Sequence, residues 1–163
     1  MGQILSTSAL RESSAVRSYK SGRRPRILVV DEEPAAADFL AELLRQNGYA
    51  TEAAYDATDA LEKALLSPPE LVITDVALPG MSGVQLAVIV KRAYPDCKIL
   101  LYSGQVATPE LIRSPHRAPY DFTLLSKPVR PSDLLALVEH RLGASGSLMM
   151  PAAADEFQPA HLS

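Results

Sequence analysis

The fold of this chain is decided by residues Leu71–Gly83, which have the sequence LVITDVALPGMSG. The stretch opens with a short apolar and β-branched run after Pro68-Pro69, a pattern that predicts a buried strand. Asp75 ends this strand, and a Pro-Gly loop follows that no regular element can cross. Because aspartate is seldom fully buried unless it is paired, we expect Asp75 at the carboxyl edge of a sheet, where ligands bind in open α/β folds. The alternative is that Asp75 only caps the next helix.

The composition predicts one domain with an aliphatic core. The chain has 163 residues, of which 47% are apolar, and no apolar run approaches the ~20 residues needed to span a bilayer. The single Cys97 and the lack of a signal-peptide core lead us to expect a soluble, cytoplasmic protein that does not contact membranes. Residues 1–26 hold six basic residues and one acidic residue, while the net charge of the chain is −3. The rest of the chain is therefore acidic, which argues against nucleic acid as its main ligand.

Strand and helix patterns alternate along the chain. We expect strands at 26–30, 49–54, 71–75, 98–102 and 122–125. We expect helices at 35–46, 84–94 and 131–142, a further helix capped by Asp56 or Thr58, and a short one that starts after Thr108. The apolar period of the first two helices predicts buried faces that include Phe39 and Leu65. Short connections between parallel strands permit only right-handed crossovers, so we expect an α/β domain over 26–142 with helices on both faces of a five-stranded parallel sheet. Disordered segments are expected on either side, a basic arm at 1–25 and a tail at 143–163.

Polar side chains follow four of the predicted strands. Asp31 and Glu32 follow the first strand and Asp75 ends the third, while Ser103 and Lys127 follow the fourth and fifth. The carboxyl ends of parallel strands lie at one edge of the sheet, and carboxylates gathered there repel one another unless they share a cation. Oxygen ligands with room for water suit Mg²⁺. A carboxylate nucleophile, a divalent ion, a hydroxyl and a lysine together predict phosphoryl transfer.

These motifs resemble those of the receiver domains of bacterial two-component response regulators, over about residues 26–142. Ile27–Pro34 resembles the acidic motif that opens the family's sequence, and Asp75 stands where the family has its phosphoacceptor. Leu78–Gly83 resembles the loop that follows, Ser103-Gly104 the pair after the fourth strand and Lys127-Pro128 the pair after the fifth. The resemblance implies a flavodoxin-like, doubly wound fold with strand order 2-1-3-4-5. It also implies a response regulator that stands alone, without an output domain.

The resemblance further implies a role for each matching residue. Asp75 would take a phosphoryl group from a histidine kinase or a histidine phosphotransfer protein, and its state would be sensed by a downstream protein. Lys127 would pair with Asp75 and then with the phosphoryl group, which Ser103 would also bind. The chain would catalyse only its own phosphorylation and dephosphorylation, so it would not be an enzyme, and no direct DNA binding is expected. We also expect the Lys127-Pro128 bond to be cis, because a tight turn is where such bonds occur.

The implied magnesium site consists of Glu32, Asp75 and the backbone carbonyl of Ala77, with Asp31 acting directly or through water. Two positions depart from the family pattern. Glu32 stands where aspartate is common, and its longer side chain can still reach a metal. Leu124, three residues before Lys127, stands where the family often has a tyrosine or phenylalanine that turns inward on phosphorylation. Leu124 is either a replaced switch or an ordinary core leucine.

Two other functions compete with that of a phosphoacceptor. A receiver-like interaction module would keep the fold and act without phosphorylation, but the acceptor set in this sequence is complete. A phosphatase or dehalogenase with an aspartyl nucleophile would carry a second aspartate two residues further on. Asp75 is followed by Val76-Ala77, and Asp31 by Glu32-Glu33, so this hypothesis fits poorly.

Overall fold

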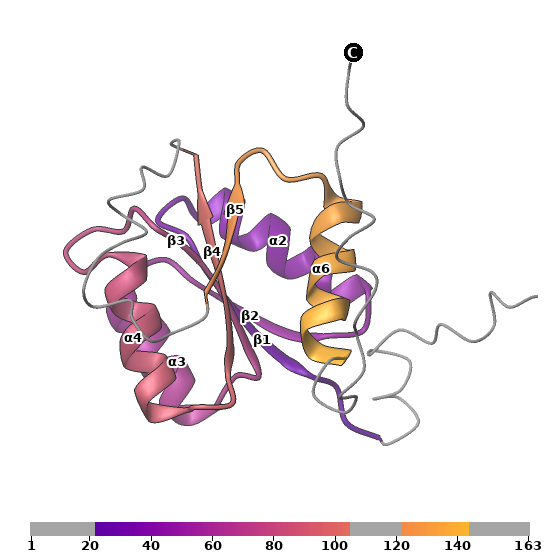
Figure 1. The fold of residues 1–163 in the computed structure, drawn as a ribbon, viewed down its shortest axis with the longest axis horizontal. Helices are drawn as coiled ribbons and strands as arrows, with labels where there is room; N and C mark the ends of the chain where they lie inside the picture. Colours follow the sequence, from indigo (N-terminus) through magenta and orange to yellow (C-terminus); the bar gives the residue numbers. More distant parts are fainter. Residues whose placement is uncertain (1–21, 105–121, 144–163) are drawn as a thin grey trace, which may run out of the picture.

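The computed structural model describes residues 22–104 and 122–143, which form a parallel sheet covered by helices (Figure 1). Its strands are β1 Arg26–Val30, β2 Ala50–Ala54, β3 Leu71–Asp75, β4 Lys98–Ser103 and β5 Thr123–Ser126. Its helices are α2 Pro34–Gln46, α3 Ala57–Leu66, α4 Gly83–Ala93 and α6 Pro131–Gly143. The expected order of strands and helices is therefore confirmed for these residues.

The five strands are parallel and lie in the order β2-β1-β3-β4-β5, as expected. All five residues of β3 are buried, because β1 and β4 flank it and helices cover both faces. The register places Asp75 opposite Tyr102, and Ser103 opposite Ser126. The carboxyl ends of β3, β4 and β5 therefore meet at one edge of the sheet.

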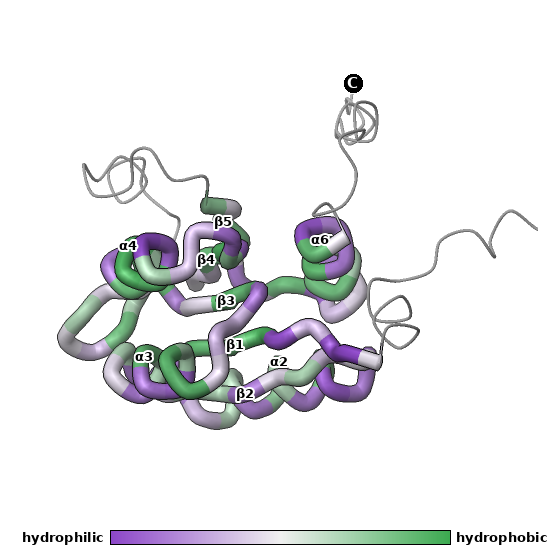
Figure 2. Tube along the Cα trace, turned by 90° about the horizontal axis from the view of Figure 1, so that it is seen from below, coloured by the Kyte–Doolittle hydropathy of each residue, from purple (hydrophilic) through white to green (hydrophobic). Residues whose placement is uncertain are grey.

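The helices form two layers, with α3 and α4 on one face of the sheet and α2 and α6 on the other (Figures 1 and 2). Alternate residues of each strand supply the two cores. In β1, Leu28 and Val30 pack toward α3 and α4, and Ile27 and Val29 pack toward α2 and α6. This alternation follows from the two-residue period of a strand. Because both faces are covered, β1 and β3 are apolar along most of their length (Figure 2).

Helix starts follow the local chemistry of the chain. Pro34 occupies the first turn of α2, where its missing N–H leaves no hydrogen bond unmade. The side chain of Asp56 accepts a hydrogen bond from the backbone N–H of Asp59, so Asp56 rather than Thr58 caps α3. Ser82 and Gln85 form a capping box at the start of α4, which fixes where the loop after Asp75 ends.

Two predicted core residues are exposed. Phe39 is 61% exposed and Leu65 is 73% exposed, so the prediction that they face the core was wrong. The buried residues of α2 are Ala37, Leu40, Ala41 and Leu44, a stripe that repeats every three or four residues. Phe39 lies one residue, or about 100° of helical rotation, from that stripe. In α3 the buried positions are small alanines, and Leu65 falls outside the arc that the sheet covers.

Several predictions fall on residues outside the described ranges, namely most of the basic arm, the helix after Thr108 and the tail from 144 onward. Among the described residues, none of the helices is both long enough and apolar enough to cross a membrane. Cys97 is buried, and burial raises the pKa of its thiol to about 12. The Lys127-Pro128 bond is cis, as expected.

Candidate functional site

A lysine joins two aspartates at the carboxyl edge of the sheet. The ammonium nitrogen of Lys127 lies 2.9 Å from Oδ2 of Asp75 and 3.1 Å from Oδ2 of Asp31. Both aspartates are buried, with 7% and 2% of their surface exposed, and Lys127 reaches them from the loop after β5. Three segments that are far apart in sequence therefore converge on one cluster of charges, as the sequence predicted.

Backbone N–H groups in the loops after β1 and β3 donate hydrogen bonds to the second oxygen of each aspartate. Oδ1 of Asp75 accepts a hydrogen bond of 3.0 Å from the backbone N–H of Ala77, and Oδ1 of Asp31 accepts one of 3.0 Å from that of Glu33. Each carboxylate thus has one oxygen on its own loop and one on Lys127. The loops and Lys127 together therefore supply a hydrogen-bond donor to both oxygens of each carboxylate.

The loop between β3 and α4 passes very close to Asp75. The backbone N–H of Gly83 donates to the carbonyl of Val76 at 2.9 Å, which folds the loop back on the strand end. A methyl group on Gly83 would overlap the carbonyl oxygen of Asp75. Gly83 is therefore a residue on which the site depends. The sequence contained this glycine in the loop motif but did not show that side chains are excluded there.

Ser103 ends β4 next to the base of Lys127. Its side chain is buried, with 7% of the residue exposed, and its carbonyl accepts a 2.8 Å hydrogen bond from the backbone N–H of Lys127. The main chain of Lys127 is thereby anchored to β4 while its side chain crosses to Asp75. The structure brings Asp31, Asp75, Ser103 and Lys127 to the same edge of the sheet, as predicted.

The family of the chain follows from a comparison with protein-family models. The model described as the response regulator receiver domain matches residues 27–139. This chain belongs to the response regulator receiver family. The match includes every residue of the predicted site, from Asp31 to Lys127.

Curated relatives of the receiver domain are longer proteins. The DNA-binding response regulator MtrA of Mycolicibacterium smegmatis is 33% identical over 119 residues, which cover 73% of this chain and 51% of MtrA. The nitrogen assimilation regulatory protein NtrX of Azorhizobium caulinodans is 31% identical over 118 residues, which cover 71% of this chain and 26% of NtrX. This chain thus spans about half the length of MtrA and about a quarter of that of NtrX.

Solved receiver structures share the fold. A CheY-like receiver domain protein from Methanospirillum hungatei JF-1 has a TM-score of 0.67 and 28% identity, and the match covers 74% of this chain and 95% of that one. Chemotaxis protein CheY4 of Vibrio cholerae has a TM-score of 0.65 and 25% identity, covering 72% and 98% of the two chains. The sheet and its helices are therefore those of a receiver domain, and the flavodoxin-like fold is confirmed.

The predicted magnesium ligands of the receiver domain differ in burial, because Asp31 and Asp75 are buried and Glu32 is not. Glu32 is exposed, and the described residues contain no group of three acidic, histidine or cysteine side chains that could hold a metal ion. Asp31 and Asp75 nevertheless already share one cation, the Lys127 ammonium. Mg²⁺ is commonly held by one or two carboxylates with water in its remaining positions. The two buried carboxylates are ligands of the kind that Mg²⁺ takes, and the binding of Mg²⁺ by Asp31, Asp75, Glu32 and the Ala77 carbonyl stays a prediction.

Sequence reasoning did not identify an aromatic partner of Lys127. The ring of Tyr102, the residue before Ser103, has its centroid 4.3 Å from the ammonium nitrogen. Burial alone would lower the pKa of Lys127, but its hydrogen bonds and charge attraction to Asp75 and Asp31 together outweigh burial and raise that pKa above its ordinary value. Lys127 is therefore a firmly charged cation with three partners.

Leu124 lies on the opposite face of the sheet from Tyr102. It is partly buried and packs with the core beneath α3 and α4, whereas Tyr102 packs with the core beneath α2 and α6. The position three residues before Lys127, where the family often has an aromatic residue, is therefore a leucine that packs in the core. The aromatic side chain that contacts the site is instead on β4.

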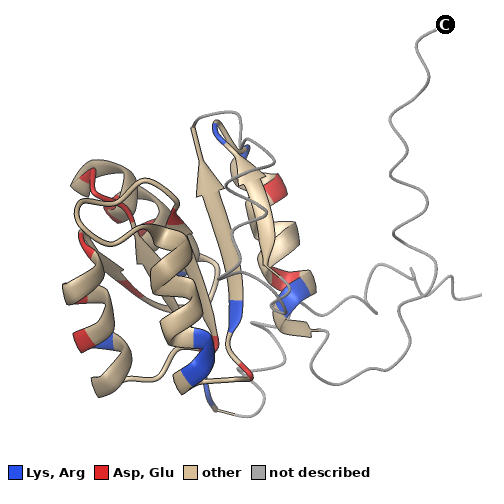
Figure 3. Cartoon of the chain, turned by 60° about the vertical axis from the view of Figure 1, so that its left-hand side comes forward, with Lys and Arg blue, Asp and Glu red and all other residues tan. Residues whose placement is uncertain are grey.

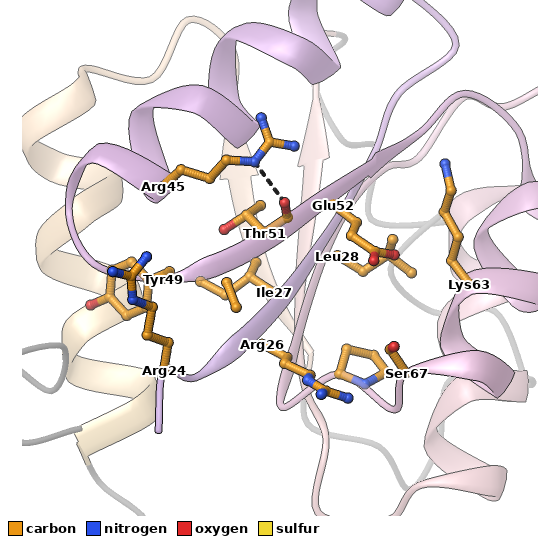
Figure 4. A pocket seen from close by; sticks show the side chains of 12 residues that line it. Arg24, Arg26, Ile27, Leu28, Arg45, Tyr49, Thr51, Glu52, Lys63 and Ser67 are labelled. Atoms are coloured by element: carbon orange, nitrogen blue, oxygen red, sulfur yellow. Dashed lines mark hydrogen bonds between the residues drawn. The ribbon is translucent and has the colours of Figure 1, made fainter. Parts of the chain in front are cut away.

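The receiver domain also has a groove of about 410 Å³ away from the carboxylates, along the start of β1 and the edge strand β2 (Figure 4). Four basic side chains line it, Arg24, Arg26, Arg45 and Lys63. Arg45 donates to the carbonyl of Thr51 at 2.8 Å, and Lys63 donates to that of Ala53 at 2.6 Å. Two of these cations therefore cap carbonyls of the edge strand, a role that discourages pairing with other strands.

Replacing Lys127 with alanine should lower the free energy of unfolding in metal-free buffer by about 3 kcal/mol. The change leaves two buried carboxylates facing each other without a cation. Urea unfolding with a chelator measures the loss. Lys63→Ala is the matched control, since Lys63 pairs at 2.9 Å with Asp59, whose side chain is 34% exposed, and should cost about 1 kcal/mol or less. Equal losses in the two variants would contradict this account of the site.

Proposed function

We propose that this receiver domain accepts a phosphoryl group on Asp75 from a phosphohistidine of a histidine kinase or histidine phosphotransfer protein. The observation that carries the proposal is the Lys127 ammonium held between Asp75 and Asp31 at the edge of the sheet. A buried ion pair with no chemical role contributes little net stability compared with apolar packing. Its position at the strand ends, where ligands bind in such sheets, supports a role in chemistry instead.

In the proposed reaction a carboxylate oxygen of Asp75 attacks phosphorus. An O–P bond forms while the P–N bond of the phosphohistidine breaks, and the imidazole nitrogen keeps the electron pair and takes up a proton. The Lys127 ammonium neutralises negative charge on the transferred group, and the Ser103 hydroxyl binds one of its oxygens. Asp31 and Asp75 would hold Mg²⁺, with Glu32 and the Ala77 carbonyl as further proposed ligands, and the bound ion would supply additional charge neutralisation.

The consequence of phosphorylation would be a change in binding to a downstream protein. The receiver domain would turn over no substrate besides its own phosphoryl group, and it would work in the cytoplasm. For the residues described we propose no contact with membranes and no direct contact with DNA, because acidic and basic positions are mixed over both helical layers (Figure 3). MtrA is described as a DNA-binding response regulator, and this chain matches 51% of its length.

Mg²⁺ should stabilise the unphosphorylated receiver domain. A ligand that binds only the folded state adds roughly 1–3 kcal/mol at ten to a hundred times its Kd. Thermal melts across millimolar MgCl₂, with KCl at equal ionic strength as the salt control, measure this gain. Asp31→Asn should lose most of it, because one of the two clustered carboxylates becomes neutral. A melting temperature that is the same with and without Mg²⁺ would count against the metal site.

Acetyl phosphate provides a direct test of the proposed function, because it supplies a phosphoryl group without a kinase. Intact mass should show one added phosphoryl group in the presence of Mg²⁺ and none in the presence of a chelator. Phosphotransfer from the organism's own kinases would then identify the donor. A protein that binds its partners equally well whether or not it can be phosphorylated would favour the alternative, an interaction module that acts without phosphate.

A further inference from the structure

Tyr102 meets the Lys127 ammonium through the face of its ring, a contact that does not involve an anion. Its ring centroid lies 4.3 Å from the Lys127 ammonium, which also meets the carboxylates of Asp75 and Asp31. Burial raises the pKa of Tyr102, so the phenol is neutral at neutral pH and the contact is between a cation and the face of an aromatic ring.

The ring is held in place by the sheet and by the core. Tyr102 lies opposite Asp75 on β3 and opposite Leu125 on β5, which fixes its backbone between the two strands that carry the site. Its side chain packs with the core beneath α2 and α6. A lysine side chain is long and flexible, and its ammonium is strongly hydrated, so its position depends on what surrounds it. Tyr102 supplies a fixed surface for that ammonium.

This contact differs from the other two in what happens during phosphoryl transfer. When Asp75 becomes an acyl phosphate, the carboxylate that bound Lys127 is consumed as an anion, and negative charge moves to the phosphoryl oxygens. The attraction between the ammonium and the Tyr102 ring is unaffected by that change. The ring therefore keeps Lys127 near Asp75 while its anionic partner is replaced.

We propose that Tyr102 is a positioning residue that orders the Lys127 side chain for phosphoryl transfer to Asp75. This inference rests on the proposed function for its effect on rate, but not for its effect on the order of Lys127. A preorganised charge lowers the barrier more than a mobile one, because it needs no reorganisation when the reaction occurs. If Tyr102 had only a structural role, it would contribute packing to the core and would not affect the order of the Lys127 side chain.

The first experiment measures the order of Lys127 in the unphosphorylated protein. Carbon-13 relaxation of the lysine ε-methylene groups reports side-chain mobility, and the Lys127 signal is assigned by its loss in Lys127→Ala. We expect the ε-carbon of Lys127 to become more mobile in Tyr102→Leu and to stay ordered in Tyr102→Phe, which keeps the ring. Unchanged order of Lys127 in Tyr102→Leu would overturn the inference, whether or not the protein accepts a phosphoryl group.

The second experiment measures the maximal rate of phosphorylation at saturating acetyl phosphate and Mg²⁺. Tyr102→Leu should lower that rate about threefold to tenfold, the range expected for a partly exposed contact between a cation and a ring, and Tyr102→Phe should restore most of it. Should Tyr102→Leu not fold at the assay temperature, Tyr102→Met is the second variant without a ring. A Tyr102→Phe variant as slow as Tyr102→Leu would show that the ring is not the group that acts.

A double-mutant cycle separates positioning from packing. Because Tyr102 acts through Lys127, the rate effect of Tyr102→Leu should disappear in a Lys127→Ala background. Leu137→Ala removes packing from the same core and is the control for a general loss of stability; its rate effect should not depend on Lys127. Equal rate losses for Tyr102→Leu with and without Lys127 would overturn the inference. Wild-type protein that gains no phosphoryl group would instead overturn the proposed function, and the relaxation experiment would still decide the role of Tyr102.

Discussion

Gly83→Ala is expected to lower the free energy of unfolding by about 3 kcal/mol or more, at the upper end of what overpacking costs. The added methyl group would overlap the backbone carbonyl oxygen of Asp75 and lie 2.8 Å from its carbonyl carbon. Both are backbone atoms of a central, buried strand, so the overlap cannot be relieved by turning a side chain. Urea unfolding of both proteins gives the difference.

The chain offers a matched control for this substitution. Apart from the backbone of its own helix and its chain neighbours, the described residues place no atom within 4 Å of a methyl group on Gly143, the last residue of α6. Gly143→Ala should therefore be neutral or slightly stabilising. Gly83→Ala should also lower the rate of phosphorylation, because a shift that relieves the overlap moves either the backbone of Asp75 or the loop that follows it. A Gly83→Ala protein as stable as Gly143→Ala would show that the loop after β3 is not packed against the strand as described.

Asp75→Asn should abolish the gain of a phosphoryl group from acetyl phosphate. An amide oxygen is a far weaker nucleophile than a carboxylate. The neutral side chain also loses the negative charge that pairs with Lys127 and that would help to hold Mg²⁺. Intact mass at matched times compares the variant with the wild type. Asp96→Asn, at an exposed position away from the site, should be phosphorylated normally. An Asp75→Asn protein that is modified at the wild-type rate would mean that the acceptor lies elsewhere.

The sheet and the main charged cluster could be predicted from the sequence because few topologies are compatible with alternating strands and helices. A helix between successive strands favours parallel strands joined by crossovers, and parallel strands bring their carboxyl ends to one edge. The meeting of Asp31, Asp75 and Lys127 follows from that rule and from where each residue stands relative to its strand. Their distances and burial could not be predicted, because these depend on the loops.

Other features of the site depend on geometry that a sequence pattern does not contain. The contact of Tyr102 with Lys127 requires that both side chains lie on the same face and at the same height, which strand alternation alone left open. The closeness of Gly83 to Asp75 depends on how the loop folds back. In α2, each residue turns the helix by about 100°. The predicted buried face was one residue too wide, and it therefore included Phe39, which is exposed.

The central claim is that the phosphoryl group is carried by the side chain of Asp75, and borohydride reduction tests it most directly. An acyl phosphate is reduced to an alcohol, which converts a phosphorylated aspartate into homoserine and leaves ordinary carboxylates intact. Protein phosphorylated with acetyl phosphate and Mg²⁺ is reduced, digested and sequenced by mass spectrometry, with unphosphorylated protein treated in parallel. The account predicts homoserine at position 75 of the phosphorylated sample and nowhere else. Homoserine at another aspartate, with Asp75 unchanged, would contradict it.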